Sequence, residues 1–188
     1  MNMRMSLRVC VIGALLALAA CSSKTEDRAQ SAASAQPPRA DLMKIPDELK
    51  NGPQLTVNQA ILDFVNETLA FKKSDQGLVF RAKTDAPIWF AGWAYDETHK
   101  QTPDRVWIEL TGKESGLRFF FLANRFENAA VADSFKVPWA RMLGYRTPAI
   151  TDHNIPRGAY DVKIYQIYQG VAELTKFYAY PSITVIVE

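Results

Sequence analysis

The chain has 188 residues, of which 48% are hydrophobic and 22% charged, a composition that excludes a disordered or fibrous protein. Arg4 and Arg8 lie in an N-terminal segment without acidic residues, so 22 − 2 = 20 basic side chains face 20 acidic ones beyond residue 20. This balance gives no electrostatic reason to bind nucleic acid or an anionic bilayer.

Residues 1–20 have the pattern of a signal peptide. A short basic start is followed by an apolar run over 9–18 and then by small residues. The run is too short to span a bilayer as a helix, which takes about 20 residues. We therefore expect residues 1–20 to be removed.

The cleavage region, Leu18-Ala19-Ala20-Cys21, resembles the bacterial lipobox. The resemblance implies that Cys21 carries a diacylglycerol thioether and becomes the N-terminus, whereas the alternative is an ordinary signal peptide with a chance cysteine. Two or three palmitate-like chains would anchor the protein firmly, since each buried methylene contributes ~0.8 kcal/mol. Ser22 follows, and in such lipoproteins this residue favours the outer membrane, on its periplasmic face or at the cell surface.

Only two cysteines occur, Cys10 and Cys21. Cys10 would leave with the signal peptide and Cys21 would carry lipid. The count therefore excludes disulfides, thiol nucleophiles and cysteine-ligated zinc in the mature domain.

Residues 21–54 are predicted to be a flexible tether. The stretch 22–40 contains no aromatic and no branched aliphatic residue, so it cannot bury enough apolar surface to offset its ordering entropy. Residues 41–54, with two prolines and a glycine, form a transition. A single domain is expected over 55–188.

Within 55–188, short apolar runs alternate with Gly, Pro and Asp turn formers, which indicates many short strands. Strands are predicted at 60–65, 78–83, 88–95, 105–111, 117–123, 159–168, 176–180 and 183–187. The segment 128–143 has a helical composition. We predict a mainly β fold, a single antiparallel immunoglobulin-like β-sandwich with one or two short helices around 128–143.

Three segments carry a second resemblance: Phe90–Asp96, Arg125–Ala132 and Ile155–Val162. Their order resembles the β-sandwich module found beside or fused to bacterial glycosyltransferases and multi-pass membrane proteins of surface-polysaccharide pathways. The resemblance covers most of 60–168. It implies a sandwich fold and a connection with surface glycans.

Flat aromatic side chains are the candidate ligand-binding residues. Trp107 and Tyr165 fall on the polar faces of their predicted strands, and Trp93 shares a strand face with Tyr95. Such rings stack on sugar rings and also anchor protein interfaces. The alternative is that they belong to the core, which we favour for Trp93.

Asp63, Asp96 and Arg125 are a candidate ion-pair set at one end of the sandwich, and paired charges of this kind more often serve the fold than a ligand. The two histidines, His99 and His153, each lie near an Asp in a polar loop. Each has the chemistry of a general base or metal ligand, although a lone loop histidine is usually only solvated. We assign no catalytic residue, metal or cofactor.

Together these features predict a non-catalytic, lipid-anchored envelope lipoprotein whose domain binds or organises a surface component, most plausibly glycan. The first alternative is an assembly partner of a secretion, pilus or polysaccharide-export machine, and the second is an envelope glycan hydrolase. Exposed aromatic residues beside a groove would favour a glycan ligand. A large flat apolar patch would favour a protein partner. A pocket of paired carboxylates would favour an enzyme.

Overall fold

The computed structural model describes residues 38–188, apart from 71 and 97–99. The predicted signal peptide, Cys21 and His99 lie outside these residues. The structure is 51% strand and 13% helical, which confirms a mainly β fold. Short helices occur at 129–134 and 138–143, within the segment where they were predicted.

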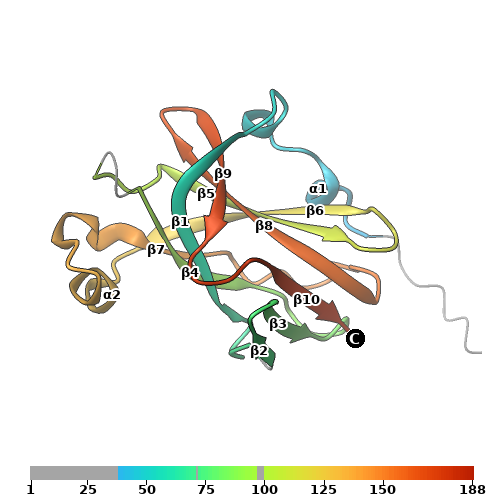
Figure 1. Ribbon diagram of the computed structural model, residues 1–188. Coiled ribbons are helices and arrows are strands. Elements are labelled where there is room, and N and C mark those ends of the chain that lie inside the picture. Colours follow the sequence, from blue (N-terminus) through green and yellow to red (C-terminus); the bar gives the residue numbers. More distant parts are fainter. Residues whose placement is uncertain (1–37, 71, 97–99) are drawn as a thin grey trace, which may run out of the picture. The chain divides into compact units, whose positions relative to one another are not determined.

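The elements follow one another along the chain with short connections (Figure 1). In order they are α1 (Ala40–Met43), η1 (Asp47–Leu49), β1 (Gln54–Val65), β2 (Lys72–Ser74), β3 (Gly77–Ala82), β4 (Phe90–Tyr95), β5 (Arg105–Gly112), β6 (Arg118–Phe126), α2 (Ala129–Ser134), η2 (Pro138–Leu143), β7 (Gly144–Arg146), β8 (Gly158–Tyr168), β9 (Val171–Phe177) and β10 (Ile183–Val187).

The sheet closes on itself instead of forming the two separate layers of an immunoglobulin-like sandwich. Seven strands make a ring in the order β8-β5-β6-β7-β4-β1-β9, and β9 completes it by pairing with β8, where Leu174 lies opposite Tyr165. Closure gives every strand of the ring a partner on both sides over at least part of its length. The fold is therefore a seven-stranded barrel.

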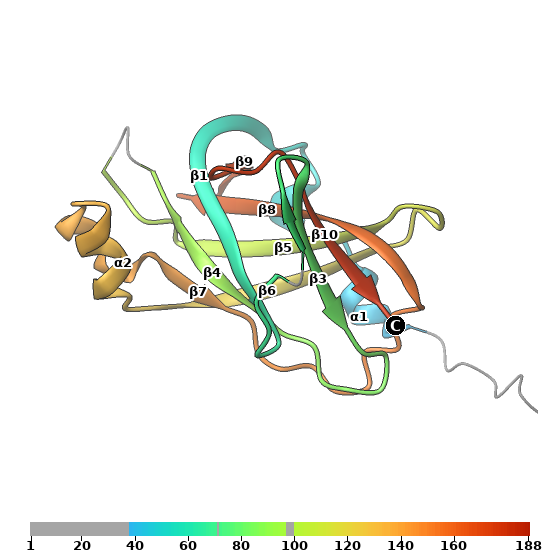
Figure 2. The same ribbon diagram turned by 60° about the horizontal axis from the view of Figure 1, so that its bottom comes forward.

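Strand β8 holds the sheet together because it has three partners. It pairs with β5 over Tyr160–Ile167, with β10 over 158–161 and with β9 over 165–168. Strands β10, β3 and β2 continue the sheet beyond the barrel, as the two views show (Figures 1 and 2). Most pairs are antiparallel, but β1–β9 and β3–β10 are parallel.

Alternate residues of each strand fill the barrel. On β5 these are Val106, Ile108 and Leu110, which are at most 1% exposed. Phe90 and Phe121 meet edge to face with ring centroids 4.9 Å apart. Each such side chain contributes roughly 1.5–3 kcal/mol by leaving water, so this cluster is the main source of stability.

Residues 39–50, the strap, were expected to belong to the 21–54 tether but instead pack on the barrel. Leu42 joins the main core and Leu49 joins a second cluster on the outer face of the sheet. Glu48 also forms an ion pair with Arg105. The Arg39 amide donates to the His153 carbonyl oxygen at 3.3 Å, and composition alone did not reveal these few contacts.

Gly92 of β4 lies where two other groups approach its backbone. A Cβ there would overlap the Ile61 carbonyl oxygen and lie 2.7 Å from the Tyr145 hydroxyl. That hydroxyl donates to the same Ile61 oxygen at 2.6 Å. A glycine at this position therefore allows Tyr145 to join β7 to β1 across β4.

We predict that Gly92→Ala lowers the free energy of unfolding by about 1–3 kcal/mol, because backbone atoms cannot move away as a side chain can. Urea unfolding measures the effect. Gly112→Ala is the matched control, since the new methyl group would meet the Ser115 hydroxyl, which can rotate away by giving up the exposed 3.3 Å hydrogen bond that it accepts from the Leu117 amide. Equal stability of the two variants would contradict the explanation.

Candidate functional site

The outer face of β5 carries the residues singled out for ligand binding. Because side chains alternate along a strand, Arg105, Trp107 and Glu109 all point away from the barrel interior. Trp107 lies opposite Tyr165 of β8 on one side and Leu122 of β6 on the other. The fold thus brings Trp107 and Tyr165 together as cross-strand neighbours.

Tyr165 is buried beneath this face and forms a hydrogen bond to a carboxylate. Its side chain is only 3% exposed, and its hydroxyl donates to Glu109 Oε2 at 2.6 Å. It offers no flat surface to a ligand in this arrangement. Of the two neighbouring rings, Trp107 is therefore the one available for stacking.

Glu109 is a fully buried carboxylate held by several donors. Arg118 binds it with two hydrogen bonds, 2.7 and 3.0 Å long, and the Thr111 hydroxyl donates at 2.6 Å. The Lys163 ammonium lies 3.8 Å away. A bidentate guanidinium and two hydroxyls satisfy the lone pairs of the carboxylate, which makes burial of the charge tolerable.

The titration of this group reflects two opposed effects. Burial raises the pKa of Glu109, but the hydrogen bonds from Arg118, Thr111 and Tyr165 more than offset it and leave a pKa of about 2. Burial and the hydrogen bond to Glu109 raise the pKa of Tyr165. Both groups therefore keep one protonation state near neutral pH. Sequence alternation placed Glu109 on the polar face but did not signal its burial.

A hollow of about 430 Å³ lies between the strap and β5. Trp107 and Arg105 form one wall and the strap forms the other. The lining residues are Asp41, Lys44, Ile45, Pro46, Asp47, Glu48, Arg105 and Trp107. This hollow combines one aromatic ring with carboxylates and cations, and we call it the Trp107 hollow.

The indole N–H of Trp107 is buried and has no hydrogen-bond partner within the part of the chain that the structure describes. An unmatched buried donor costs about 1–3 kcal/mol and is uncommon in folded proteins. The protein thus keeps an indole here although its N–H is unsatisfied.

Trp93 lies in a different place. It is 4% exposed and packs beneath α2 and η2, with ring centroids 4.8 Å from Phe135 and 5.5 Å from Tyr178. The structure therefore does not bring Trp93 together with Trp107. Its environment corresponds to the core alternative.

The three charges proposed as an ion-pair set do not pair with one another. Arg125 donates to the Met142 carbonyl oxygen at 3.2 Å and to the Thr102 hydroxyl. Asp96 accepts from Gln101 at 3.5 Å, and burial raises the pKa of Asp63. Among the described residues, no ion pair links Asp63, Asp96 and Arg125.

His153 is 1% exposed, and both its ring nitrogens are engaged with the backbone. Nε2 lies 3.1 Å from the Ala86 carbonyl oxygen, so it carries the proton, and Nδ1 accepts from the Ile155 amide at 3.0 Å. Burial lowers the pKa of His153. In this tautomer it has no free lone pair for a metal or a substrate proton.

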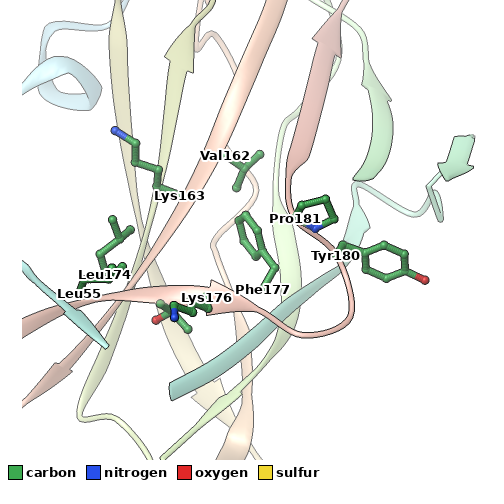
Figure 3. A pocket seen from close by; sticks show the side chains of 9 residues that line it. Leu55, Val162, Lys163, Leu174, Lys176, Phe177, Tyr180 and Pro181 are labelled. Carbon is green, nitrogen blue, oxygen red and sulfur yellow. The ribbon is translucent and has the colours of Figure 1, made fainter. Parts of the chain in front are cut away.

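A second hollow, of about 390 Å³, opens where β8 and β9 separate (Figure 3). It is lined by Leu55, Val162, Lys163, Leu174, Thr175, Lys176, Phe177, Tyr180 and Pro181. The sequence did not point to it, because Leu174 and Thr175 lie outside the predicted strands and Leu55 comes from the distant β1. We call it the fork.

Neither a family model nor a curated protein matches this chain. Over 38–188, leaving out 71 and 97–99, no cluster of three potential metal ligands occurs. The same residues include no helix of the length and hydrophobicity needed to cross a bilayer. The functional argument therefore rests on the two hollows and their chemistry.

We predict that Glu109→Gln makes the free energy of unfolding fall less steeply as the pH is lowered below about 4.5. A carboxyl whose pKa is about 2 when folded and near 4.5 when free stabilises the fold fully above pH 4.5, and this is lost as the pH falls toward 2. The shift corresponds to about 3 kcal/mol. Urea unfolding between pH 7 and 3 measures it.

Glu114→Gln, at the exposed tip of the β5–β6 hairpin, is the control and should lose stability at low pH as steeply as the unmodified protein. If Glu109→Gln loses stability at low pH as steeply as the unmodified protein, other carboxyl groups are responsible for the acid-induced loss of stability.

Proposed function

We propose that this protein is a non-catalytic, lipid-anchored envelope lipoprotein whose barrel binds a neutral surface glycan in the Trp107 hollow. The observation that carries the proposal is the composition of that hollow. A partly buried Trp107 forms one wall, and carboxylates and a guanidinium surround it. Flat apolar faces of sugar rings stack on indoles, while hydroxyls donate to carboxylates and accept from cations.

The charge balance of the hollow favours a neutral sugar. Its three carboxylates already have cationic partners in the chain, since Asp41 pairs with Arg39, Asp47 with Lys50 and Glu48 with Arg105. Paired groups still offer lone pairs and N–H groups to hydroxyls. Lys44 also lines the hollow and forms no ion pair within the described part of the chain, but three carboxylates stand against two cations in the lining, so charge gives a uronic acid or a phosphate little advantage.

Binding fits these carboxylates better than hydrolysis. Glycoside cleavage needs a carboxylic acid whose pKa is raised, so that it can protonate the leaving group. Here the hydrogen bond from Arg39 lowers the pKa of Asp41, and the hydrogen bond from Lys50 lowers that of Asp47. Neither residue is suited to donate a proton near neutral pH.

The anchor is the second part of the proposal. The lipobox Leu18–Cys21 and Ser22 support attachment at Cys21 and residence in the outer membrane. The residues that follow would then hold the hollow near the glycan-bearing surface. We expect mass spectrometry of the purified protein to show an N-terminal acylated Cys21, and Cys21→Ser to leave the membrane fraction. An unmodified N-terminus would contradict the anchor.

For the glycan, we predict that Trp107→Ala weakens binding to immobilised neutral oligosaccharides by at least about tenfold, since a lost stacking contact of about 1.4 kcal/mol corresponds to that factor. Full-length protein in detergent is screened on hexose, N-acetylhexosamine and uronic-acid oligosaccharides. The affinity for the strongest neutral binder is then measured for each variant, beside a thermal melt.

Trp139→Ala is the matched control, because Trp139 is 37% exposed and lies in η2, outside the hollow. It should retain the affinity of the unmodified protein. Binding that survives in a folded Trp107→Ala variant, or that falls equally in Trp139→Ala, would refute the site. Selective binding of uronic acids would refute the preference for neutral sugars.

A further inference from the structure

Strand β8 changes partner along one of its sides, and the change leaves a gap. Residues 158–161 pair with β10 and residues 165–168 pair with β9. Between these segments, residues 162–164 pair with β5 on the other side, but on this side no strand of the described part of the chain pairs with them. The gap arises because β9 turns away to follow β1, where Lys176 lies opposite Gln59 and Phe177 opposite Ala60.

Unpaired strand edges present backbone hydrogen-bonding groups. Successive residues of a strand direct their N–H and C=O groups to opposite neighbours, so at least one residue of 162–164 directs both groups into the fork. Backbone groups of this kind require partners. An extended backbone that enters the fork would supply them, as in other complexes that add a strand to a sheet.

The side chains of the fork follow the same two-residue period. Val162 belongs to the core cluster and Phe177 packs against it, so both lie on the inward side. Lys163 and Lys176, their neighbours in sequence, lie on the outward side and are partly or fully exposed. Figure 3 shows the Phe177 ring reaching toward Val162, with Leu55 and Leu174 on one side and Pro181 on the other.

We propose that the fork binds an extended segment of a partner polypeptide as an added strand, with apolar and acidic residues in alternation. Its apolar side chains would lie over Val162 and Phe177, and its acidic side chains would approach Lys163 and Lys176. Leu55, at 70% exposure, would be covered by the same segment. The gap from 161 to 165 matches roughly four strand residues, about 13 Å.

The peptide ligand is favoured over a lipid by the backbone edge. An acyl chain would cover Val162 and Phe177 and its head group would reach a lysine, but it would leave the peptide groups of 162–164 without partners. A strand satisfies the apolar surface, the charges and the backbone together. This site is separate from the Trp107 hollow, so the two proposals stand or fall independently.

Two labelled peptides test the proposal on the full-length protein in detergent. One alternates Glu and Val over seven residues, and the other alternates Lys and Val. Fluorescence anisotropy should show saturable binding of the Glu peptide and at least about tenfold weaker binding of the Lys peptide. A Glu peptide that is N-methylated on every second residue keeps the side chains but lacks half of the N–H donors, and it should also bind at least about tenfold more weakly.

Lys176→Glu should weaken binding of the Glu peptide by about tenfold or more, and Lys83→Glu, on an exposed residue after β3, should leave it unchanged. Trp107→Ala should also leave it unchanged. Hydrogen exchange should show new protection within 162–164 when the Glu peptide is bound.

Three outcomes would overturn the proposal. They are no saturable binding of the Glu peptide, equal binding of the N-methylated peptide, and equal binding of the Lys peptide. Displacement of the Glu peptide by dodecanoate, together with equal binding of the N-methylated form, would assign the fork to an anionic amphiphile instead.

Discussion

The pairing of β8 with β9 is the constraint on which the rest of the structure depends. Where Tyr165 meets Leu174, the sheet closes into a barrel and the side chains of β5 and β6 become either interior or exterior. The same closure fixes the outer face on which Trp107 lies. Because β9 pairs with β8 only briefly before it follows β1, closure also creates the fork. Both hollows are thus consequences of one strand pairing.

The outer face of β5 shows that a strand face with polar residues, which would be expected to lie in solvent, can be buried. Alternation along this strand predicted correctly that Val106 and Ile108 face the core while Trp107 and Glu109 face away. It could not predict that this second face is itself partly covered. Glu109 is fully buried on this face, and Arg118 and Tyr165 then become necessary to stabilise its charge.

Strands with strong apolar alternation were predictable from the sequence. The predicted 183–187 coincides with β10, and the predicted 105–111 differs from β5 by one residue. In contrast, β9 covers 171–177 where 176–180 was expected, because Glu173 and Thr175 interrupt its apolar character. Strand β7 has three residues, Gly144–Arg146, which is too short for a period to appear.

Barrel closure lay beyond prediction for a different reason. A barrel and a sandwich both need apolar and polar residues to alternate along each strand. The two folds differ in which strands pair with each other. Here the parallel pair β1–β9 joins segments far apart in the sequence, and no local signal marks it. The β8–β9 pair is a hairpin that turns at Gln169 and Gly170, and it was missed because the predicted strand began at 176 instead of 171. The Trp107 hollow was half predictable, since Trp107 was recognised but the strap that faces it was assigned to a tether.

The strap also has a mechanical consequence. A pull on the chain at Arg39 meets the hydrogen bond from the Arg39 amide to the His153 carbonyl oxygen, then Leu42, Leu49 and the Glu48–Arg105 ion pair, before it loads a strand. A few side-chain contacts yield at lower force than a strand pulled along its length against a whole hydrogen-bonded ladder. A pull that detached the strap would therefore take one wall of the Trp107 hollow with it.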